Sequence, residues 1–85
     1  MTNEIKIIVI DDEPVVLDFM KDCLKSYQVA LFDNPLKALA EMKNTPYDLI
    51  ITDQIMPDMS GVELLMKVKK IHTDFIGIVL SAFID

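Results

Sequence analysis

Residues 5–14 read IKIIVIDDEP: an almost continuous apolar run, then three acidic residues, then a proline. A strand that is buried on both faces is apolar throughout, whereas a strand with one wet face alternates apolar and polar residues. The run therefore predicts a strand in the interior of a parallel sheet. Pro14 suits the first position of a helix, because the N–H that proline lacks has no partner there. Together these residues predict a strand, a short acidic loop and a helix.

Three further apolar runs follow along the chain, at Gln28–Phe32, Asp48–Thr52 and Phe75–Leu80. Helical patterns separate the four runs, with start signals at Asn34, which precedes a proline, and at Ser60, where Ser-Gly-Val-Glu forms a capping box. Strands that alternate with helices are typical of an α/β fold with a parallel sheet. Right-handed crossovers then place helices on both faces of the sheet, which makes it doubly wound.

The spacing of apolar residues predicts which side chains of each helix face the sheet. In the first helix, expected from Pro14 to Tyr27, they are Val16, Phe19, Met20, Cys23 and Tyr27. In the second they are Leu36, Leu39 and Ala40, and in the third, expected to end at His72, they are Leu64, Leu65, Val68 and Ile71. Cys23 is accordingly expected to be a small buried side chain.

Size and charge exclude several classes of protein. The 85 residues suit one domain, residues 1–85, with a formal net charge of −6. Every basic residue is a lysine and no basic stripe is present, so we expect no binding to nucleic acid by this segment. The single cysteine excludes an internal disulfide and is typical of the reducing cytoplasm. The longest apolar stretch, residues 75–84, is shorter than the roughly 20 residues that span a bilayer, so we expect no membrane association.

Carboxylates and a hydroxyl follow three of the predicted strands. Asp11 and Asp12 follow the first, Asp53 the third and Ser81 the fourth. Ligands of an open α/β sheet bind at the carboxyl ends of its strands. Clustered carboxylates repel one another, and Mg²⁺, which prefers oxygen ligands, would relieve the repulsion. An aspartate can also act as a nucleophile toward phosphorus. Asp53 alone is more simply explained as a helix cap or a solvated loop residue, but the four residues together favour a site.

Three segments resemble motifs of the receiver domains of response regulators, which act in two-component signalling. Residues 8–14, IVIDDEP, resemble the acidic start of the family. Residues 53–61, DQIMPDMSG, resemble its phosphorylation-site segment, D-x-x-M-P-x-M-x-G. Residues 78–82, IVLSA, resemble its fourth strand, which ends in Ser or Thr and a small residue. The resemblance runs the length of the chain and is carried mainly by the second motif, which is the most specific.

The resemblance implies a flavodoxin-like fold and a role for each site residue. Asp53 would accept a phosphoryl group from a sensor histidine kinase in a Mg²⁺-dependent reaction, and the module would then switch an output domain or protein partner. Mg²⁺ would be held by Asp11, Asp12, Asp53 and the backbone carbonyl of Ile55. Ser81 would hydrogen-bond the phosphoryl group, and Gln54 and Phe83 would control the access of water. Such a module is not an enzyme, apart from catalysing its own phosphorylation and dephosphorylation.

The resemblance also implies that the sheet is incomplete. Receiver domains continue beyond the position of Asp85 through a fourth helix, a fifth strand and a fifth helix. We therefore expect four strands and three helices, without the lysine that ends the fifth strand in the family. The fourth strand, followed by Phe83 and Ile84, would then be an exposed apolar edge. Because such an edge can pair with another chain, a dimer through this strand is expected.

Two other functions stay open. The first is a receiver remnant that binds partners without being phosphorylated, which the missing lysine favours and the intact carboxylates oppose. The second is a Mg²⁺-dependent phosphatase with an aspartate nucleophile. Enzymes of the haloacid-dehalogenase type carry a D-x-D-x-[TV] motif after the first strand, but residues 11–15, DDEPV, lack the second aspartate at that spacing.

Overall fold

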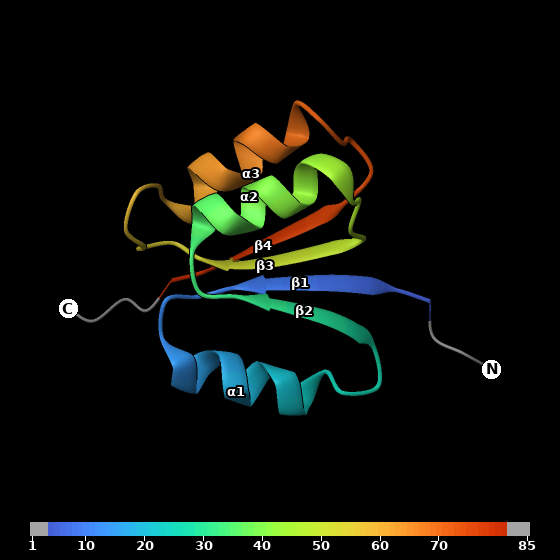
Figure 1. The fold of residues 1–85 in the computed structure, drawn as a ribbon, viewed down its shortest axis with the longest axis vertical. Helices are drawn as coiled ribbons and strands as arrows, with labels where there is room; N and C mark the ends of the chain where they lie inside the picture. The colour runs from blue at the N-terminus through green and yellow to red at the C-terminus, as the bar shows by residue number, and fades with distance from the viewer. Residues whose placement is uncertain (1–3, 82–85) are drawn as a thin grey trace.

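The computed structural model describes residues 4–81, which form a four-stranded sheet between two layers of helices (Figure 1). The elements are β1 (Lys6–Ile10), α1 (Pro14–Cys23), β2 (Gln28–Phe32), α2 (Pro35–Asn44), β3 (Leu49–Asp53), α3 (Gly61–Lys69) and β4 (Ile76–Leu80). All neighbouring strands are parallel, in the order β2-β1-β3-β4. This is the order of flavodoxin-like sheets, so the predicted doubly wound α/β fold is confirmed. No helix within residues 4–81 is long and apolar enough to cross a membrane.

The core lies on both sides of β1, as the apolar run predicts. Residues 7–10 are all buried, and β1 pairs with both β2 and β3. Ile8 and Ile10 face α2 and α3, where they pack with Ile50 of β3. Ile7 and Val9 face the opposite layer, which contains α1. In Figure 1, α1 accordingly lies alone on one face of the sheet, with α2 and α3 together on the other.

The predicted helix starts are formed as their sequences indicate. The Asn34 side chain accepts hydrogen bonds from the backbone N–H groups of Leu36, at 2.8 Å, and Lys37, at 3.2 Å. At the start of α3, Ser60 Oγ accepts from the Glu63 N–H and Glu63 Oε1 accepts from the Ser60 N–H, both at 3.2 Å. Each cap satisfies N–H groups that the first turn of a helix leaves unpaired. The loops before both helices are thereby fixed.

The predicted inner face of α1 is largely wrong. The helix ends at Cys23, and Leu17 and Met20 pack against the sheet together with Leu24, which follows the helix; of these only Met20 was predicted. Phe19 and Cys23 are exposed, and so is Tyr27, beyond the helix. Apolar residues surround much of this helix, so the spacing alone fits more than one inward face. Contact with the sheet, through residues such as Val29 and Leu31, selects the face that carries Leu17.

The other two helices need smaller corrections. In α2 the buried side chains are Pro35, Ala38 and Met42, while Leu36 and Ala40 are exposed. Because the helix begins directly after Asn34, positions 35, 38 and 42 share the face toward the sheet. In α3 Leu64 and Val68 are buried and Leu65 is half-buried, as predicted. Ile71 is exposed because the helix ends at Lys69, before reaching it.

Truncating a buried side chain of α3 should lower the free energy of unfolding more than truncating an exposed side chain of the same helix. Leu64→Ala removes a fully buried side chain and should lower the free energy of unfolding by about 2–5 kcal/mol. Met66→Ala, at an exposed position of the same helix, should change it by less than about 0.5 kcal/mol. Urea unfolding followed by circular dichroism measures both. If Leu64→Ala does not fold, Ile50→Val should still show a loss of about 0.5–1.5 kcal/mol. Equal effects of Leu64→Ala and Met66→Ala would contradict the packing of α3.

Candidate carboxylate site at the strand ends

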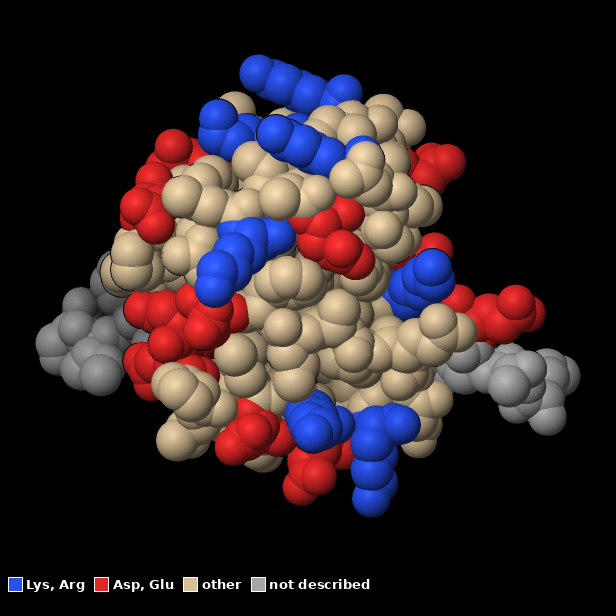
Figure 2. Space-filling view, viewed as in Figure 1, with Lys and Arg blue, Asp and Glu red and all other residues tan. Residues whose placement is uncertain are grey.

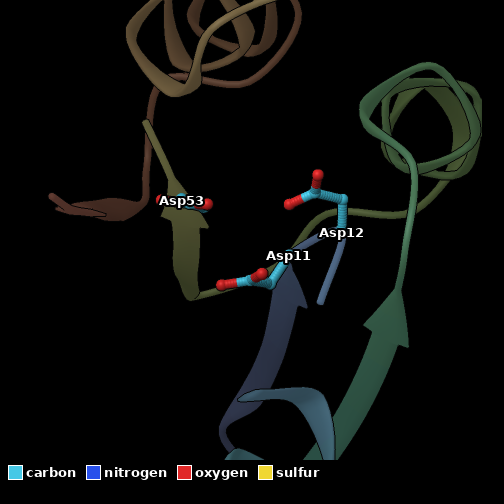
Figure 3. A group of neighbouring side chains, drawn as sticks. All are labelled: Asp11, Asp12 and Asp53. Atoms are coloured by element: carbon cyan, nitrogen blue, oxygen red, sulfur yellow. The ribbon is translucent and has the colours of Figure 1, made fainter. Parts of the chain in front are cut away.

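The sheet brings three carboxylates to one point. Ile10 of β1 is in register with Thr52 of β3, so the next residues, Asp11 and Asp53, leave neighbouring strands at the same level. Asp12 follows in the loop, and one carboxylate oxygen from each of the three aspartates lies within 4.8 Å of the others. Figure 3 shows the three side chains around a shared space. In Figure 2 acidic side chains gather at the left of the molecule, where Figure 1 places the carboxyl ends of the strands.

Asp11 is the buried member of the cluster. Its side chain is only 5% exposed, its N–H donates to the Phe32 carbonyl at 3.0 Å, and its Oδ1 accepts from the Glu13 N–H at 2.9 Å. Burial raises the pKa of the Asp11 carboxyl, and the neighbouring charges of Asp53, Asp12 and Glu13 raise it further. The hydrogen bond from the Glu13 N–H opposes the shift but does not cancel it. Burial and the neighbouring carboxylates therefore disfavour the charged form of Asp11.

Gln54, at the start of the loop that leads to α3, fixes the carboxylate of Asp53. Asp53 Oδ1 accepts from the Gln54 N–H at 2.8 Å, and the same N–H lies 3.0 Å from the carbonyl oxygen of Leu80 at the end of β4. The Gln54 carbonyl accepts from the Gly61 N–H, and its side-chain Oε1 accepts from the Val62 N–H, both at 3.0 Å. Gln54 thus joins the Asp53 carboxylate, the end of β4 and the first turn of α3.

The resemblance implies that Gln54 controls the access of water, and that role stays a prediction. In the structure the Gln54 side chain accepts a hydrogen bond from the start of α3. Among the sequence signals, only the eight-residue spacing between Gln54 and Val62 relates to this contact, and spacing alone does not indicate a hydrogen bond. Phe83, given the same role as Gln54, lies outside the described residues.

Gly61 allows the helix to approach the strand end. A Cβ at this position would overlap the carbonyl oxygen of Asp53 and would lie 3.1 Å from both the Asp53 carbonyl carbon and Thr52 Cγ2. Thr52 is fully buried and its Oγ1 donates to the Asp53 carbonyl oxygen at 3.0 Å, so this backbone has little room to move. Glycine at position 61 therefore lets the start of α3 lie against the backbone of Asp53, and this contact restricts the position of Asp53.

Ser81 lies at the same site. It lines an open depression of about 400 Å³ together with Asp11, Glu13, Val16, Asp53 and Leu80. A phosphoryl group in this depression would be near both Asp53 and the Ser81 hydroxyl. The Ile55 side chain is exposed, and a role for its backbone carbonyl stays a prediction.

The donor atoms fit Mg²⁺. The cluster offers carboxylate oxygens alone, which are the hard ligands that Mg²⁺ takes, and this ion needs only one or two carboxylates besides water and phosphate. Burial is the main cause of the raised pKa of Asp11 and the neighbouring carboxylates add to it, and a divalent cation would favour the charged form against both effects. Among residues 4–81, no lysine lines the depression.

Comparison with known proteins identifies the family. The family model described as "Response regulator receiver domain" matches residues 7–85. The chain belongs to this family. Residues of this receiver domain are 39% identical over 70 positions to the sensor histidine kinase TmoS of Ectopseudomonas mendocina, covering 81% of the chain and 7% of that protein. A putative two-component response regulator of Arabidopsis thaliana is 36% identical over 83 positions, covering 93% and 14%.

Solved structures agree with the fold of this receiver domain. A CheY-like receiver domain protein from Methanospirillum hungatei JF-1 superposes with a TM-score of 0.89 at 28% identity, over 98% of this chain and 68% of that one. The chain thus spans about two thirds of a solved receiver domain and only a small part of the two larger relatives. The family acts as a signalling module in two-component systems, and the resemblance inferred from the three motifs is confirmed.

The close contact between Gly61 and the Asp53 backbone can be tested with a matched pair of glycine substitutions. Gly61→Ala should lower the free energy of unfolding by about 1–3 kcal/mol, because its Cβ meets backbone that cannot yield. Gly77→Ala should cost less than about 1 kcal/mol, because the nearest atoms to its Cβ all belong to the flexible side chain of Leu65, with Cδ1 at 2.8 Å and Cδ2 at 3.1 Å. Urea unfolding gives both values. Amide chemical shifts of Asp53 and Gln54 should move only in Gly61→Ala, and unchanged shifts there would contradict the contact.

The raised pKa of Asp11 predicts a pH dependence of stability without metal. The folded protein binds the Asp11 proton more tightly than the unfolded chain does. Protonated Asp11 therefore contributes to the free energy of unfolding. This contribution is full below the ordinary Asp pKa of about 3.9 and is lost as pH rises through the raised pKa. Asp11→Asn removes the charge and should therefore be more stable than the wild type at pH 7 in chelator, with the difference shrinking toward pH 4. Urea unfolding across this range measures it. Asp22→Asn, at an exposed position of α1, serves as the control. A wild-type advantage at pH 7 in chelator would contradict the prediction.

Proposed function

We propose that this receiver domain accepts a phosphoryl group on Asp53 from the phosphohistidine of a sensor histidine kinase, with Mg²⁺ as the cofactor. The observation that supports this most is the meeting of Asp11, Asp12 and Asp53 at the ends of two neighbouring parallel strands. Clustered carboxylates repel one another, and a metal-dependent site needs such a cluster as ligands whereas a purely structural loop does not. The family assignment supports the same chemistry.

Each site residue has a proposed task. Asp11, Asp12, Asp53 and the Ile55 carbonyl would hold Mg²⁺, which when bound neutralises charge on the transferred group. The Gln54 N–H orients the Asp53 carboxylate by holding Oδ1, and Oδ2 then attacks phosphorus. A new Oδ2–P bond forms as the P–N bond of the phosphohistidine breaks, and the histidine nitrogen leaves to take up a proton. The domain catalyses this reaction and the later hydrolysis only on itself.

Ser81 would convert phosphorylation into a change of shape. A phosphoryl group adds strong acceptor oxygens, and the Ser81 hydroxyl lines the depression in which that group would lie. A move of Ser81 toward it would displace the chain that follows β4, where an output domain or protein partner could detect the change. The cytoplasm suits such a module, because the exposed Cys23 thiol has no partner for a disulfide.

The alternative function is a module that binds partners through this depression without being phosphorylated. The two functions differ in what Asp53 does. Phosphoryl transfer needs its nucleophilic oxygen, whereas a binding module needs only its shape and charge.

Intact mass after incubation with Mg²⁺ and acetyl phosphate tests the proposal. The wild type should gain the mass of one phosphoryl group, because a small phosphodonor replaces the kinase, and Asp53→Asn should gain none. Chelator should abolish the gain, and Asp22→Asn should keep it. A wild type that folds, binds Mg²⁺ and gains no mass would contradict phosphoryl transfer and favour the binding module. Release of free phosphate in many turnovers from a simple phosphate ester would instead indicate a phosphatase.

A further inference from the structure

The ends of α2 and α3 form a groove, which we call the α2–α3 groove. It has a volume of about 310 Å³ and is lined by Leu39, Lys43, Lys67, Lys70 and Ile71. Leu39 and Lys43 belong to α2, Lys67 belongs to α3, and Lys70 and Ile71 follow α3 directly. Both walls are thus elements that the structure describes in full, and none of the lining residues belongs to β4.

The groove combines apolar surface with ammonium groups. Leu39 is half-buried and Ile71 is 41% exposed, so both leave apolar surface open to an occupant. The three lysines are exposed, and none of them forms an ion pair with a carboxylate of residues 4–81. Figure 2 shows lysine side chains at the top of the molecule, where Figure 1 places α3 and the neighbouring α2. An occupant would therefore meet an apolar surface with positive charge on both walls.

The acidic residues of the two helices are engaged elsewhere. The only one in α2 is Glu41, whose Oε2 accepts a hydrogen bond from the Tyr47 hydroxyl at 2.8 Å. The only one in α3 is Glu63, whose Oε1 accepts from the Ser60 N–H at the start of that helix. No acidic side chain of residues 4–81 lines the groove. Its positive charge is accordingly not neutralised by the helices that form it.

The two walls are fixed relative to each other. His72 Nε2 lies 2.7 Å from the Met42 carbonyl oxygen, so the imidazole donates its Nε2 proton to the last turn of α2. This carbonyl is one of the four that a helix leaves unpaired at its carboxyl end. Met42 is fully buried, and the N–H groups of Ile71 and His72 donate to the Val68 carbonyl at 2.8 and 2.9 Å. The groove is therefore preformed, and its own ordering adds little cost to binding.

The formal net charge of −6 does not oppose an acidic ligand at this place. Gly61 contacts the Asp53 backbone, and Lys67 and Lys70 follow it by six and nine residues, which is about 9 and 14 Å along the helix axis. Charges at the surface are largely screened beyond about 8 Å at physiological salt. The local charge of the groove, and not that of the distant carboxylate cluster, therefore decides what binds there.

We propose that the α2–α3 groove binds an acidic segment of a partner protein. An apolar side chain of that segment would contact Leu39 and Ile71, and carboxylates on either side of it would pair with Lys43 on one wall and with Lys67 and Lys70 on the other. A helical segment that lays one face into a groove is a common mode of peptide recognition, and complementary charge supplies its specificity.

Other occupants and explanations fit the groove less well. A lipid bilayer is bound by apolar side chains that project outward, whereas Leu39 and Ile71 line a hollow. The phosphates of a nucleic acid would pair with the lysines but would place no apolar group between them. Lysines near the carboxyl end of a helix also offset its dipole, which explains their positions along α2 and α3 but not the apolar surface that they share.

Titration of the 85-residue chain with a synthetic peptide, followed by amide chemical shifts, tests the proposal. The probe is an end-blocked helical peptide of about 14 residues, with leucine flanked by glutamate on one face and alanine elsewhere. Because the contact is small, we expect a dissociation constant on the order of 100 µM in low salt. The shifts should be confined to the residues around the groove. Binding should weaken several-fold at roughly 300 mM salt, and a matched peptide with alanine in place of leucine should bind more weakly still.

Matched charge reversals locate the site. Lys67→Glu combined with Lys70→Glu should weaken binding of the leucine peptide about tenfold or more, because carboxylates would then face carboxylates. Lys21→Glu combined with Lys25→Glu changes the net charge equally at exposed positions in and after α1, and should stay within about twofold of the wild type. Asp53→Asn should bind like the wild type, so the result does not depend on the proposed phosphorylation. Urea unfolding checks that every variant is folded.

Each other outcome overturns the proposal. Absence of localised shifts at about 2 mM peptide shows that the groove does not bind an acidic segment. Equal weakening by both pairs of charge reversals assigns the binding to net charge alone. Equal affinity for the leucine and alanine peptides removes any role for Leu39 and Ile71. Sedimentation of the chain with vesicles of phosphatidylglycerol and phosphatidylcholine, without binding of the peptide, assigns the lysines to a lipid surface.

Discussion

The burial of β1 between β2 and β3 is the constraint on which the functional edge depends. Residues 7–10 are in the core on both faces, so a shift of β1 by one residue would turn each side chain toward the wrong layer. This fixes the register of β1 with β3 and brings Asp11 and Asp53 to neighbouring strand ends. Burial of the apolar side chains of β1 thereby holds the Asp11 and Asp53 carboxylates close together despite their mutual repulsion.

The backbone around the cluster lowers the cost of that repulsion without removing it. The Glu13 N–H donates to Asp11 and the Gln54 N–H to Asp53, so each of these carboxylates has one fixed donor. The acidic residues before Pro14 also precede the positive end of α1, where negative charge is favourable. The pKa of Asp11 is still raised, mainly by burial and further by the neighbouring carboxylates, so the hydrogen bond from Glu13 does not offset these effects. The site is therefore organised by the fold before any cation binds, and a cation would gain from that preorganisation.

Features that depend on short stretches of sequence were predictable, and features that depend on contacts between distant elements were not. The buried strand β1 and the caps at Asn34 and Ser60 were correct because apolar runs and capping residues act within a few positions. The convergence of the aspartates followed from the geometry of parallel sheets. The exposed Phe19 and Cys23 were mispredicted because several faces of α1 are apolar, and only packing on the sheet selects one. The Gln54 and Gly61 contacts were missed because they depend on how the start of α3 packs against the end of β3, which no local sequence signal indicates.

One backbone donor connects the proposed phosphoacceptor to the end of β4. The Gln54 N–H lies between the Asp53 carboxylate and the Leu80 carbonyl, so Asp53 and the last residue of β4 share this donor. Ser81 follows Leu80 directly and lines the same depression as Asp53. A change in the charge on Asp53 would therefore act on the end of β4 by two routes: through the hydrogen bond of Gln54 and through the hydroxyl of Ser81. The two routes are short and both run through backbone that the sheet fixes, so the strand end is the part of the described chain that responds most directly to the state of Asp53.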